Sequence, residues 1–502
     1  MKKRKRSLYA FVVVALFVRA MLAQQALIKG LDEYIVKAMK DWETPGLAIA
    51  IVKDDKLVFA KGYGVRKLGE SVPVTEKTIF ACASTTKAMA AACVGMLVDE
   101  GKIKWDDPVT KHLPWFQLYD PYVTRELTVR DLLCHRSGLA RGDLLWYQSP
   151  HSREEVIKRI RYLKPAWSLR SHYGYQNIMY IAAGEVVEAV SGKTWDEFMK
   201  ERLFTPLGMM STTTSVKDLG KFQDVATHHV KINDKFQPIP WPNYDNVGAA
   251  GTVNSNVLDY AQWIRLNLNN GMFDGRKVLS EKVVEEMQSP QTIIPIDSTT
   301  KALWPSMHFA AYGLGWTLRD YLGRKLIQHD GALDGMRARV AFVPEEKLGI
   351  VILLNSSRGP LHGAISYRIL DHYFGAPEKD WNSILLKNAK EQEEKDKAEE
   401  KKKEDARVKG TKPSLALDSY AGAYEHEMYG EVKITMEGGK LILGFYPAYV
   451  GELNHWQYDA FQVVWRDKNF DKDFATFTLT SDGKVDLLKW EGVGDFKRIE
   501  KK

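Results

Sequence analysis

The chain has 502 residues, 45% of them apolar and 27% charged, so it is globular and long enough for more than one hydrophobic core. Its formal charge of +7 falls to +1 (7 − 6 = 1) without the six basic residues of the first 23 positions, where no acidic residue occurs. The remaining chain is near neutral and lacks the excess of basic charge that nucleic acids attract, so we expect no nucleic-acid partner.

The first residues, MKKRKRSLYAFVVVALFVRAMLAQQ, combine a basic start, an apolar run from Leu8 to Val18, and the small residue Ala23 before a polar pair. This order is typical of a secretory signal peptide, so we predict one over residues 1–23 and a secreted, extracellular protein. The run is shorter than the ~20 residues of a stable membrane span, so we expect no stable span after cleavage. Because Arg19 interrupts the run, an uncleaved anchor is the alternative.

The tetrapeptide STTK occurs twice, at residues 84–87 and 298–301. The first copy precedes AMAAACVGMLVDEGK, which is rich in Ala, Met and Leu and predicts a buried helix with Ser84 in its first turn. The second copy lies between prolines without apolar periodicity, so we expect a loop there. A third Ser-x-x-Lys, at residues 481–484, contains Asp-Gly and predicts a hairpin turn.

A helix at the first copy places Ser84 and Lys87 on one face, one turn apart, which suits a serine nucleophile and its base. Lys87 can accept a proton only when neutral, and both burial and the positive end of the helix dipole lower its pKa. The helix N-terminus would also offer the backbone N–H of Ser84 to a developing oxyanion. Taken alone, such a tetrapeptide is more often a capping serine and a surface lysine.

Further along, strand-like segments such as GLAIAIVKDDKLVFAKGYG mix with amphipathic helices such as NIMYIAAGEVVEAVSG, which indicates an α/β or α+β domain over residues 24–376. Residues 377–413 are dominated by Lys and Glu and predict a charged linker, either helical or flexible. Short alternating strands with Gly-Gly and Asp-Gly turns then predict a small antiparallel β domain over residues 414–502.

The sequence offers little metal or disulfide chemistry. Three cysteines, Cys82, Cys93 and Cys134, allow one disulfide at most, and we expect packed thiols instead. No cluster of His, Cys and carboxylate residues has the spacing of a zinc site, so we expect no metal and no cofactor.

Several segments, in order along the chain, carry a family resemblance: FACASTTKAMAA, LTVRDLLCHRSGLARGD, YQNIMYIAAGEVVEAVSGKTWDEFMKERLFTPLGMMSTT, GAAGTVNSNVLDYAQW and YGLGW. From about residue 30 to 375 the chain resembles the serine β-lactamase and penicillin-binding-protein superfamily, in particular the class C β-lactamase-like esterases and peptidases. The resemblance implies an α+β sandwich of the serine β-lactamase/transpeptidase type. The C-terminal domain resembles the lipocalin-like domain often appended to these hydrolases, which can close over or beside the active site.

By this resemblance, Tyr175 relays a proton between Ser84 and the leaving group, and Asn177 holds Lys87 and the substrate amide. Tyr173, two residues earlier, is the alternative to Tyr175. We prefer Tyr175 because only it has an asparagine two residues further on.

The third element of the family site is a His-x-Gly on an edge strand, and the segment QHDGALDG supplies His329, Asp330 and Gly331. Glycine there would let the substrate backbone approach the strand, and the N–H of Ala332 would complete the oxyanion hole. Relatives commonly carry a neutral residue in place of Asp330. A carboxylate facing the acyl pocket would repel the acid group of penicillins and of peptide C-termini, which argues against β-lactam turnover.

Two other motifs have structural interpretations. Arg-Gly-Asp at 141–143 resembles an integrin-binding motif, but it lies where the family's loop after Ser-Gly-Leu carries Arg and Asp anyway. Asn355 begins an N-glycosylation sequon, which is plausible in a secreted chain, although it ends a strongly apolar strand.

Together, the residues and the resemblance predict a secreted serine hydrolase that acts through an acyl-enzyme on small esters, amides or peptides. The alternative is a secreted protein of an extracellular or biomineral matrix that keeps the fold with little or no catalysis. The oligomeric state is left open.

Overall fold

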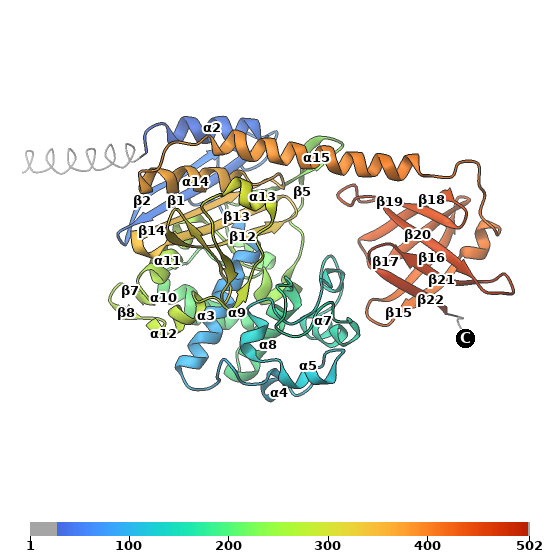
Figure 1. The fold of residues 1–502 in the computed structure, drawn as a ribbon, viewed down its shortest axis with the longest axis horizontal. Coiled ribbons are helices and arrows are strands. Elements are labelled where there is room, and N and C mark those ends of the chain that lie inside the picture. Colours follow the sequence, from blue (N-terminus) through green and yellow to red (C-terminus); the bar gives the residue numbers. More distant parts are fainter. Residues whose placement is uncertain (1–27, 500–502) are drawn as a thin grey trace, which may run out of the picture.

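The computed structural model describes residues 28–499, so the signal peptide predicted at residues 1–23 lies outside the described part of the chain. A larger α+β domain and a smaller barrel are joined by one long helix, α15 (Figure 1). Across residues 28–499, every helix is too short or too polar to cross a membrane.

An antiparallel sheet of eight strands forms the centre of the larger domain, in the order β2-β1-β14-β13-β12-β11-β10-β9. The central strands β1 and β14 are buried on both faces, which explains their continuous apolar sequences. The strands are β1 (Gly46–Lys53), β2 (Lys56–Gly64), β9 (Thr292–Ile293), β10 (Ala310–Tyr312), β11 (Thr317–Tyr321), β12 (Arg324–Leu333), β13 (Met336–Val343) and β14 (Leu348–Leu354).

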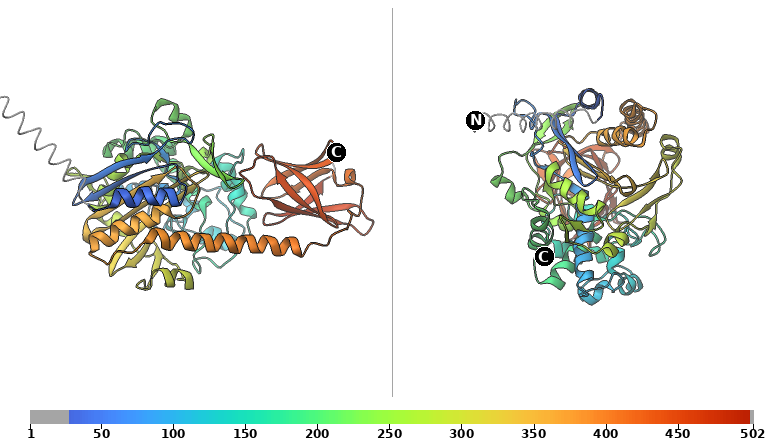
Figure 2. Two further views of the ribbon diagram at one scale, coloured as in Figure 1. Left: turned by 90° about the horizontal axis from the view of Figure 1, so that it is seen from above. Right: turned by 90° about the vertical axis from the view of Figure 1, so that its left-hand side faces the viewer.

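Helices cover both faces of this sheet. On one face α2 (Leu31–Asp41), α14 (Leu361–Phe374) and the start of α15 (Trp381–Asp405) share a core, and Figure 2 shows them along one side. On the other face α3 (Thr86–Asp99), α8 (Asn177–Ser191) and α11 (Val257–Leu268) belong to a second core. Shorter helices complete the domain: α4 (Val109–His112), α5 (Pro121–Glu126), α6 (Val129–Leu132), α7 (Arg153–Arg159), α9 (Trp195–Met199), α10 (Thr205–Leu207), α12 (Glu281–Met287) and α13 (Ser298–Leu303).

Both STTK copies begin helices. Ser84 lies in the short turn Ala83–Thr85 that leads into α3, and α3 is buried along most of its length, as predicted. Ser298 begins α13, so the expected loop is wrong there. The side chain of Asp297 caps this helix by accepting a hydrogen bond from the backbone N–H of Thr300, a local signal that needs no apolar period. Because α13 has no buried residue, burial rather than helicity separates the two copies.

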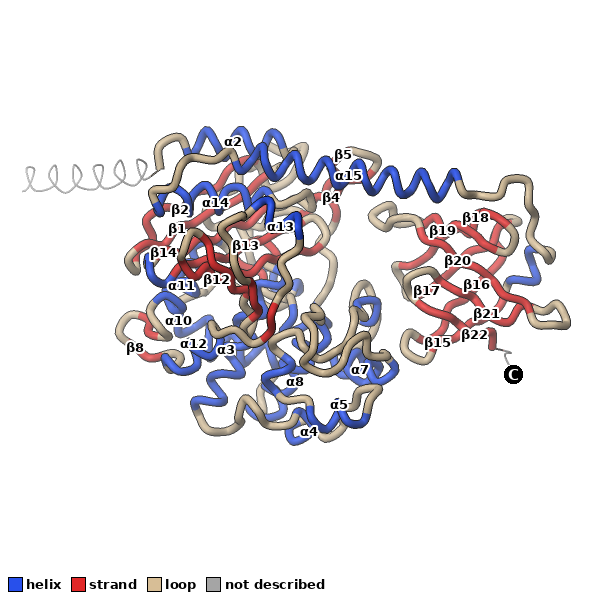
Figure 3. Tube along the Cα trace, viewed as in Figure 1, coloured by secondary structure: helices blue, strands red, loops and turns tan. Residues whose placement is uncertain are grey.

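The C-terminal domain is a closed antiparallel barrel of eight strands, as the turn-rich sequence predicts (Figure 3). Aromatic side chains such as Tyr424, Phe461 and Trp490 are buried in its core. The predicted Asp-Gly turn at residues 481–484 joins two of its strands. The strands are β15 (Gly422–His426), β16 (Gly430–Glu437), β17 (Lys440–Phe445), β18 (Tyr449–Gln457), β19 (Ala460–Trp465), β20 (Asp473–Leu479), β21 (Val485–Trp490) and β22 (Gly494–Ile499).

Helix α15 occupies most of the charged segment at residues 377–413. It has 25 residues, and at ~1.5 Å per residue it spans about 37 Å. At its start Trp381 is buried against the larger domain, and near its end Lys403 pairs with Glu491 of the barrel at 2.7 Å. Helix α15 ends at Asp405, and residues 406–416, without helix or strand, lead on to the barrel, so the predicted domain limits at 376 and 414 stay predictions.

The sequon residue Asn355 follows strand β14 and is fully buried. Its Nδ2 donates hydrogen bonds to the carbonyl oxygens of Val65 at 3.2 Å and Arg66 at 2.9 Å. A glycan on this nitrogen would break both bonds and would have to fit into a packed interior. The three cysteines are also buried, and all three are free thiols.

We therefore expect no glycan on folded protein secreted from a glycosylating host. Asn355 begins the single Asn-x-Ser/Thr sequon of the sequence, so the intact mass of the secreted protein should not change on treatment with peptide N-glycosidase. A loss of glycan mass after that treatment would contradict the burial of Asn355.

Candidate active site

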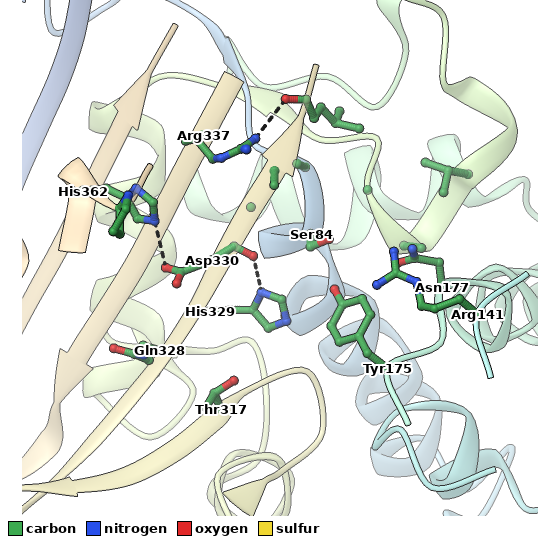
Figure 4. A pocket seen from close by; sticks show the side chains of 18 of the residues that line it. Ser84, Arg141, Tyr175, Asn177, Thr317, Gln328, His329, Asp330, Arg337 and His362 are labelled. Carbon is green, nitrogen blue, oxygen red and sulfur yellow. Dashed lines mark hydrogen bonds and ion pairs between the residues drawn. The ribbon is translucent and has the colours of Figure 1, made fainter. Parts of the chain in front are cut away.

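A cavity of about 550 Å³ opens between the C-terminal end of strand β12 and the helical part of the larger domain. Figure 4 shows Ser84 in its centre, with Tyr175 on one side and β12 on the other. Seven of the residues predicted for the site line it: Ser84, Tyr175, Asn177, His329, Asp330, Gly331 and Ala332. The N–H groups of Ser84 and Ala332 as an oxyanion hole stay a prediction.

Ser84 enters the cavity from a sharp turn between β3 (Phe80–Ala81) and α3. Ala83, directly before it, has a φ of 50°, a left-handed conformation that costs a residue with a Cβ roughly 1–2 kcal/mol. Gly331 on β12 packs against this turn, and a Cβ at Gly331 would lie 2.2 Å from the carbonyl oxygen of Cys82. In this structure the glycine therefore lets the nucleophile turn approach the strand, a role the sequence pattern did not indicate.

Lys87 is buried beneath Ser84 and contacts three oxygen atoms. Its Nζ lies 3.1 Å from Ser84 Oγ, 2.8 Å from Asn177 Oδ1 and 2.8 Å from the carbonyl oxygen of Ala250. A neutral amine has only two N–H groups, and the amide and carbonyl oxygens of Asn177 and Ala250 can only accept. The neutral form of Lys87 therefore turns its lone pair toward the hydroxyl of Ser84.

The electrostatics of the cavity favour that neutral form. Burial lowers the pKa of Lys87 well below its usual value, and the guanidinium of Arg141 lowers it further. The carboxylate of Asp143 opposes the shift without reversing it. At neutral pH, Lys87 is thus far closer to its basic form than a surface lysine.

Asn177 begins helix α8, and its orientation is fixed by Asp143. Its Nδ2 donates to Asp143 Oδ1 at 2.9 Å, and the same oxygen accepts from Trp146 Nε1 at 2.7 Å. Asp143 also pairs with Arg141. Arg141 and Trp146 line the cavity, so the Arg-Gly-Asp at 141–143 has a place in the site that its structural interpretation missed.

Tyr175, and not the alternative Tyr173, lies beside the nucleophile. The Nζ of Lys87 is 4.9 Å from the centre of the Tyr175 ring, and Tyr175 lines the cavity next to Ser84 (Figure 4). Burial raises the pKa of Tyr175 and the neighbouring Ser84 lowers it by less, so the phenol stays protonated at neutral pH. Tyr173 instead packs against the rings of His135 and Tyr312.

Two histidines pack around Tyr175. His329 on β12 contacts the carbonyl of Asp330 through Nδ1 at 2.7 Å and the hydroxyl of Tyr312 through Nε2 at 2.9 Å. Because a carbonyl only accepts, Nδ1 carries the proton. Burial lowers the pKa of His329 to about 4, which keeps it neutral. The ring of His135 lies 4.1 Å from that of Tyr175; its place in the LLCHRSGL segment was the signal that could have revealed it.

Asp330 borders the cavity, but its carboxylate points away from Ser84 (Figure 4). Successive side chains of a strand alternate between faces, so Asp330 faces α14 because Gly331 faces the nucleophile turn. Arg339 donates to both its carboxylate oxygens, at 2.6 and 2.8 Å, and His362 Nε2 lies 3.6 Å away. The side chain of Asp330 is almost half exposed, and Arg339 and His362 hold its pKa well below the usual range.

Asp330 therefore lines the cavity, but its carboxylate is held by Arg339 and is not directed at Ser84. The reason is the alternation along β12, which the motif alone does not display. The repulsion of anionic substrates inferred from this carboxylate loses its basis, because its charge is neutralised by Arg339 on the other face of the sheet.

Comparisons with known proteins cover both parts of the chain. Residues 31–374 match the family model Beta-lactamase, and residues 406–501 match a Domain of unknown function (DUF3471). The chain is 29% identical over 446 residues to Unguisins hydrolase ungD of Aspergillus violaceofuscus (strain CBS 115571), covering 82% of this chain and 77% of the relative. It is 30% identical over 322 residues to Penicillin-binding protein 4 of Amycolatopsis lactamdurans, covering 62% of this chain and 81% of the relative.

Solved structures share the fold. The octameric penicillin-binding protein homologue from Pyrococcus abyssi has a TM-score of 0.63 at 24% identity, covering 93% of this chain and 99% of that one. SurE has a TM-score of 0.56 at 20% identity, covering 95% and 100%. These likenesses support the fold, a β-lactamase-like α+β domain followed by a barrel.

The orientation of Asp330 generates a prediction about substrate charge. Asp330→Thr should change the ratio of acylation rates for penicillin G and its neutral methyl ester by no more than about twofold, because the lost charge is paired elsewhere. The variant should also lower the free energy of unfolding by about 1–3 kcal/mol, since the buried Arg339 loses its partner. Stopped-flow acylation and urea unfolding measure the two effects. A tenfold gain for the acid over the ester would contradict this orientation.

Proposed function

The chain belongs to the Beta-lactamase family, and we propose that it is a secreted serine hydrolase that forms an acyl-enzyme on Ser84. One observation carries the proposal: the buried amine of Lys87 lies 3.1 Å from Ser84 Oγ, with its two other contacts taken by oxygens that can only accept. This arrangement leaves a lone pair for the serine proton. Secretion is supported by the signal-like residues 1–23.

In the first step, Ser84 Oγ attacks the acyl carbon while its proton passes to Lys87 Nζ. The carbonyl π electrons move to the oxygen, and the backbone N–H groups of Ser84 and Ala332 hold the resulting oxyanion. When the oxyanion collapses, the bond to the leaving group breaks. The alcohol or amine leaves with the proton of Tyr175, which Lys87 then replaces. A water molecule then attacks the acyl carbon of the ester on Ser84 and gives its proton to the same base. The bond to Ser84 Oγ breaks, and Oγ takes up that proton, which restores the free serine.

We propose small esters, amides and peptides as the substrates. A cavity of about 550 Å³ is within the usual range for small-molecule sites, and two of the relatives are named as an unguisins hydrolase and a penicillin-binding protein. Since Asp330 is paired with Arg339, a carboxylate on the substrate is no obstacle.

The alternative is an extracellular protein with little or no catalysis. Against it stands the burial of Lys87, because an amine removed from water destabilises the fold and serves no purpose in a purely structural protein. The buried lysine therefore favours catalysis over the matrix-type role.

The two STTK copies give a matched test of the nucleophile. Ser84→Ala should abolish labelling by a fluorescent fluorophosphonate and abolish ester turnover, because it removes the attacking oxygen. Ser298→Ala, the same change in the same tetrapeptide on the exposed helix α13, should leave both unchanged. Peptide mass spectrometry of the labelled chain locates the adduct. An adduct on any other serine would refute the role of Ser84.

Lys87 generates a pH prediction. The acylation rate should fall as pH decreases through the folded-state pKa of Lys87, because the ammonium cannot accept a proton. Lys87→Met should slow acylation by about 10²–10⁴-fold and remove this pH dependence. Since the pKa of Lys87 is lower folded than unfolded, the unfolded chain binds the extra proton. Wild-type stability should thus rise with pH between the two pKa values, and the variant should lose this rise.

Rapid-mixing acylation and urea unfolding across pH measure both effects. Wild-type activity in Lys87→Met would assign the proton transfer to another group. If Lys87→Met keeps the wild-type slope of unfolding free energy against pH, the pKa of Lys87 is not shifted in the folded protein.

A further inference from the structure

The barrel contacts the larger domain on residues 141–151 and on the neighbouring helix α7. The side chain of Met428 reaches Gly142, where a Cβ would lie 3.1 Å from Met428 Cε. At the other end of the segment, His151 Nε2 lies 2.9 Å from the hydroxyl of Tyr446. Both contacts join the barrel to the loop that follows the Ser-Gly-Leu motif.

Met428 forms the tip of the hairpin between β15 and β16, and only 1% of its surface is exposed. A hairpin tip is open to solvent unless another element covers it, and here Gly142 and helix α7 do so. Arg159 of α7 donates Nη1 to the carbonyl oxygen of Met428 at 3.2 Å. Phe470, in the loop between β19 and β20, adds an edge contact to Tyr147, with ring centres 6.2 Å apart.

The same segment lines the cavity with its other side chains. Arg141 and Trp146 form part of the cavity wall, whereas none of the described barrel residues does. Between them, Asp143 accepts from Asn177 Nδ2 at 2.9 Å, and Asn177 Oδ1 accepts from Lys87 Nζ at 2.8 Å. One short segment thus has the barrel on one side and the base of the active site on the other.

We propose that the barrel is a positioning element of the active site, with Met428 as its positioning residue. Met428 and Tyr446 fix the 141–151 segment, and Asp143 in that segment fixes Asn177, which orients the amine of Lys87. This role rests on the proposed function, and it gives the domain that matches DUF3471 a physical task.

The effect of losing this support follows from the geometry of proton transfer. Truncating Met428 leaves a gap beside Gly142, so the segment can shift. A displacement near 1 Å in a catalytic group slows a reaction by up to about 10²-fold. The charges of Asp143 and Arg141 influence the pKa of Lys87, so a displacement of the segment also changes that pKa.

The test uses the full-length chain with three variants at two methionines of the barrel. Met428→Ala removes the contact, and Met428→Leu keeps an apolar side chain of similar volume. Met436→Ala is the control, because Met436 lies on strand β16 of the same barrel and is 39% exposed. Acylation of Ser84 by a fluorophosphonate is measured across pH, and hydrogen exchange is followed in peptides covering residues 141–151.

We expect Met428→Ala to slow acylation by about tenfold, to move the pH midpoint and to speed exchange in 141–151. Met428→Leu should restore most of the rate, and Met436→Ala should match the wild type. If Met428→Ala keeps the acylation rate, the pH midpoint and the hydrogen exchange of the wild type, the proposal is overturned. If the wild type does not label at Ser84, the proposed function fails, and the exchange data still decide whether the barrel holds the segment.

A variant that loosens the whole barrel would give faster exchange in every strand, so a second contact is tested separately. Tyr446→Phe removes a single hydroxyl, which contacts His151 and donates to the carbonyl oxygen of Tyr429 in the β15–β16 turn of the barrel. It should speed exchange around His151 and slow acylation, while the barrel strands keep their protection. Unchanged exchange and rate in Tyr446→Phe, together with a barrel-wide effect in Met428→Ala, would refute the positioning role.

Discussion

The buried amine of Lys87 is the interaction on which the rest of the site depends. It joins three separate parts of the chain, because its contacts come from the nucleophile turn, from Asn177 at the start of α8, and from the carbonyl of Ala250. Each part must be rigid, since an amine held out of water is tolerated only when its partners are in place. The packed Ala- and Met-rich helix α3 and the two cores around the sheet supply that rigidity.

The strand β12 separates two electrostatic environments. On the face of the nucleophile, Gly331 admits the turn before Ser84, and His329 stays neutral. On the opposite face, Asp330 and Arg339 form an ion pair beside α14. A single strand can therefore keep a full carboxylate one residue away from a site that needs a neutral amine, because neighbouring side chains point in opposite directions.

Sequence patterns predict those features that depend on local composition. The buried helix after Ser84, the barrel with its Asp-Gly turn and the charged segment before it all follow from composition and periodicity. The patterns fail where a single cap or a contact between distant segments decides the outcome. Asp297 converts an aperiodic stretch into α13, and the direction of Asp330 depends on what lies against Gly331. The contact of Met428 with Gly142 joins segments far apart in the chain, so no local pattern could indicate it.

The long helix α15 has a consequence for how the two domains are related. Its exposed residues are almost all charged and make few contacts, so their identity is weakly constrained. Its length is constrained more strongly, because each residue added to a helix turns its C-terminal end by about 100° and moves it by ~1.5 Å. That end contacts the barrel, where Lys403 pairs with Glu491 and Arg407, just beyond the helix, donates to the carbonyl oxygen of Trp456. A flexible tether of the same composition would absorb such a change. In this protein the length of α15, more than the type of its exposed residues, decides where its C-terminal end meets the barrel.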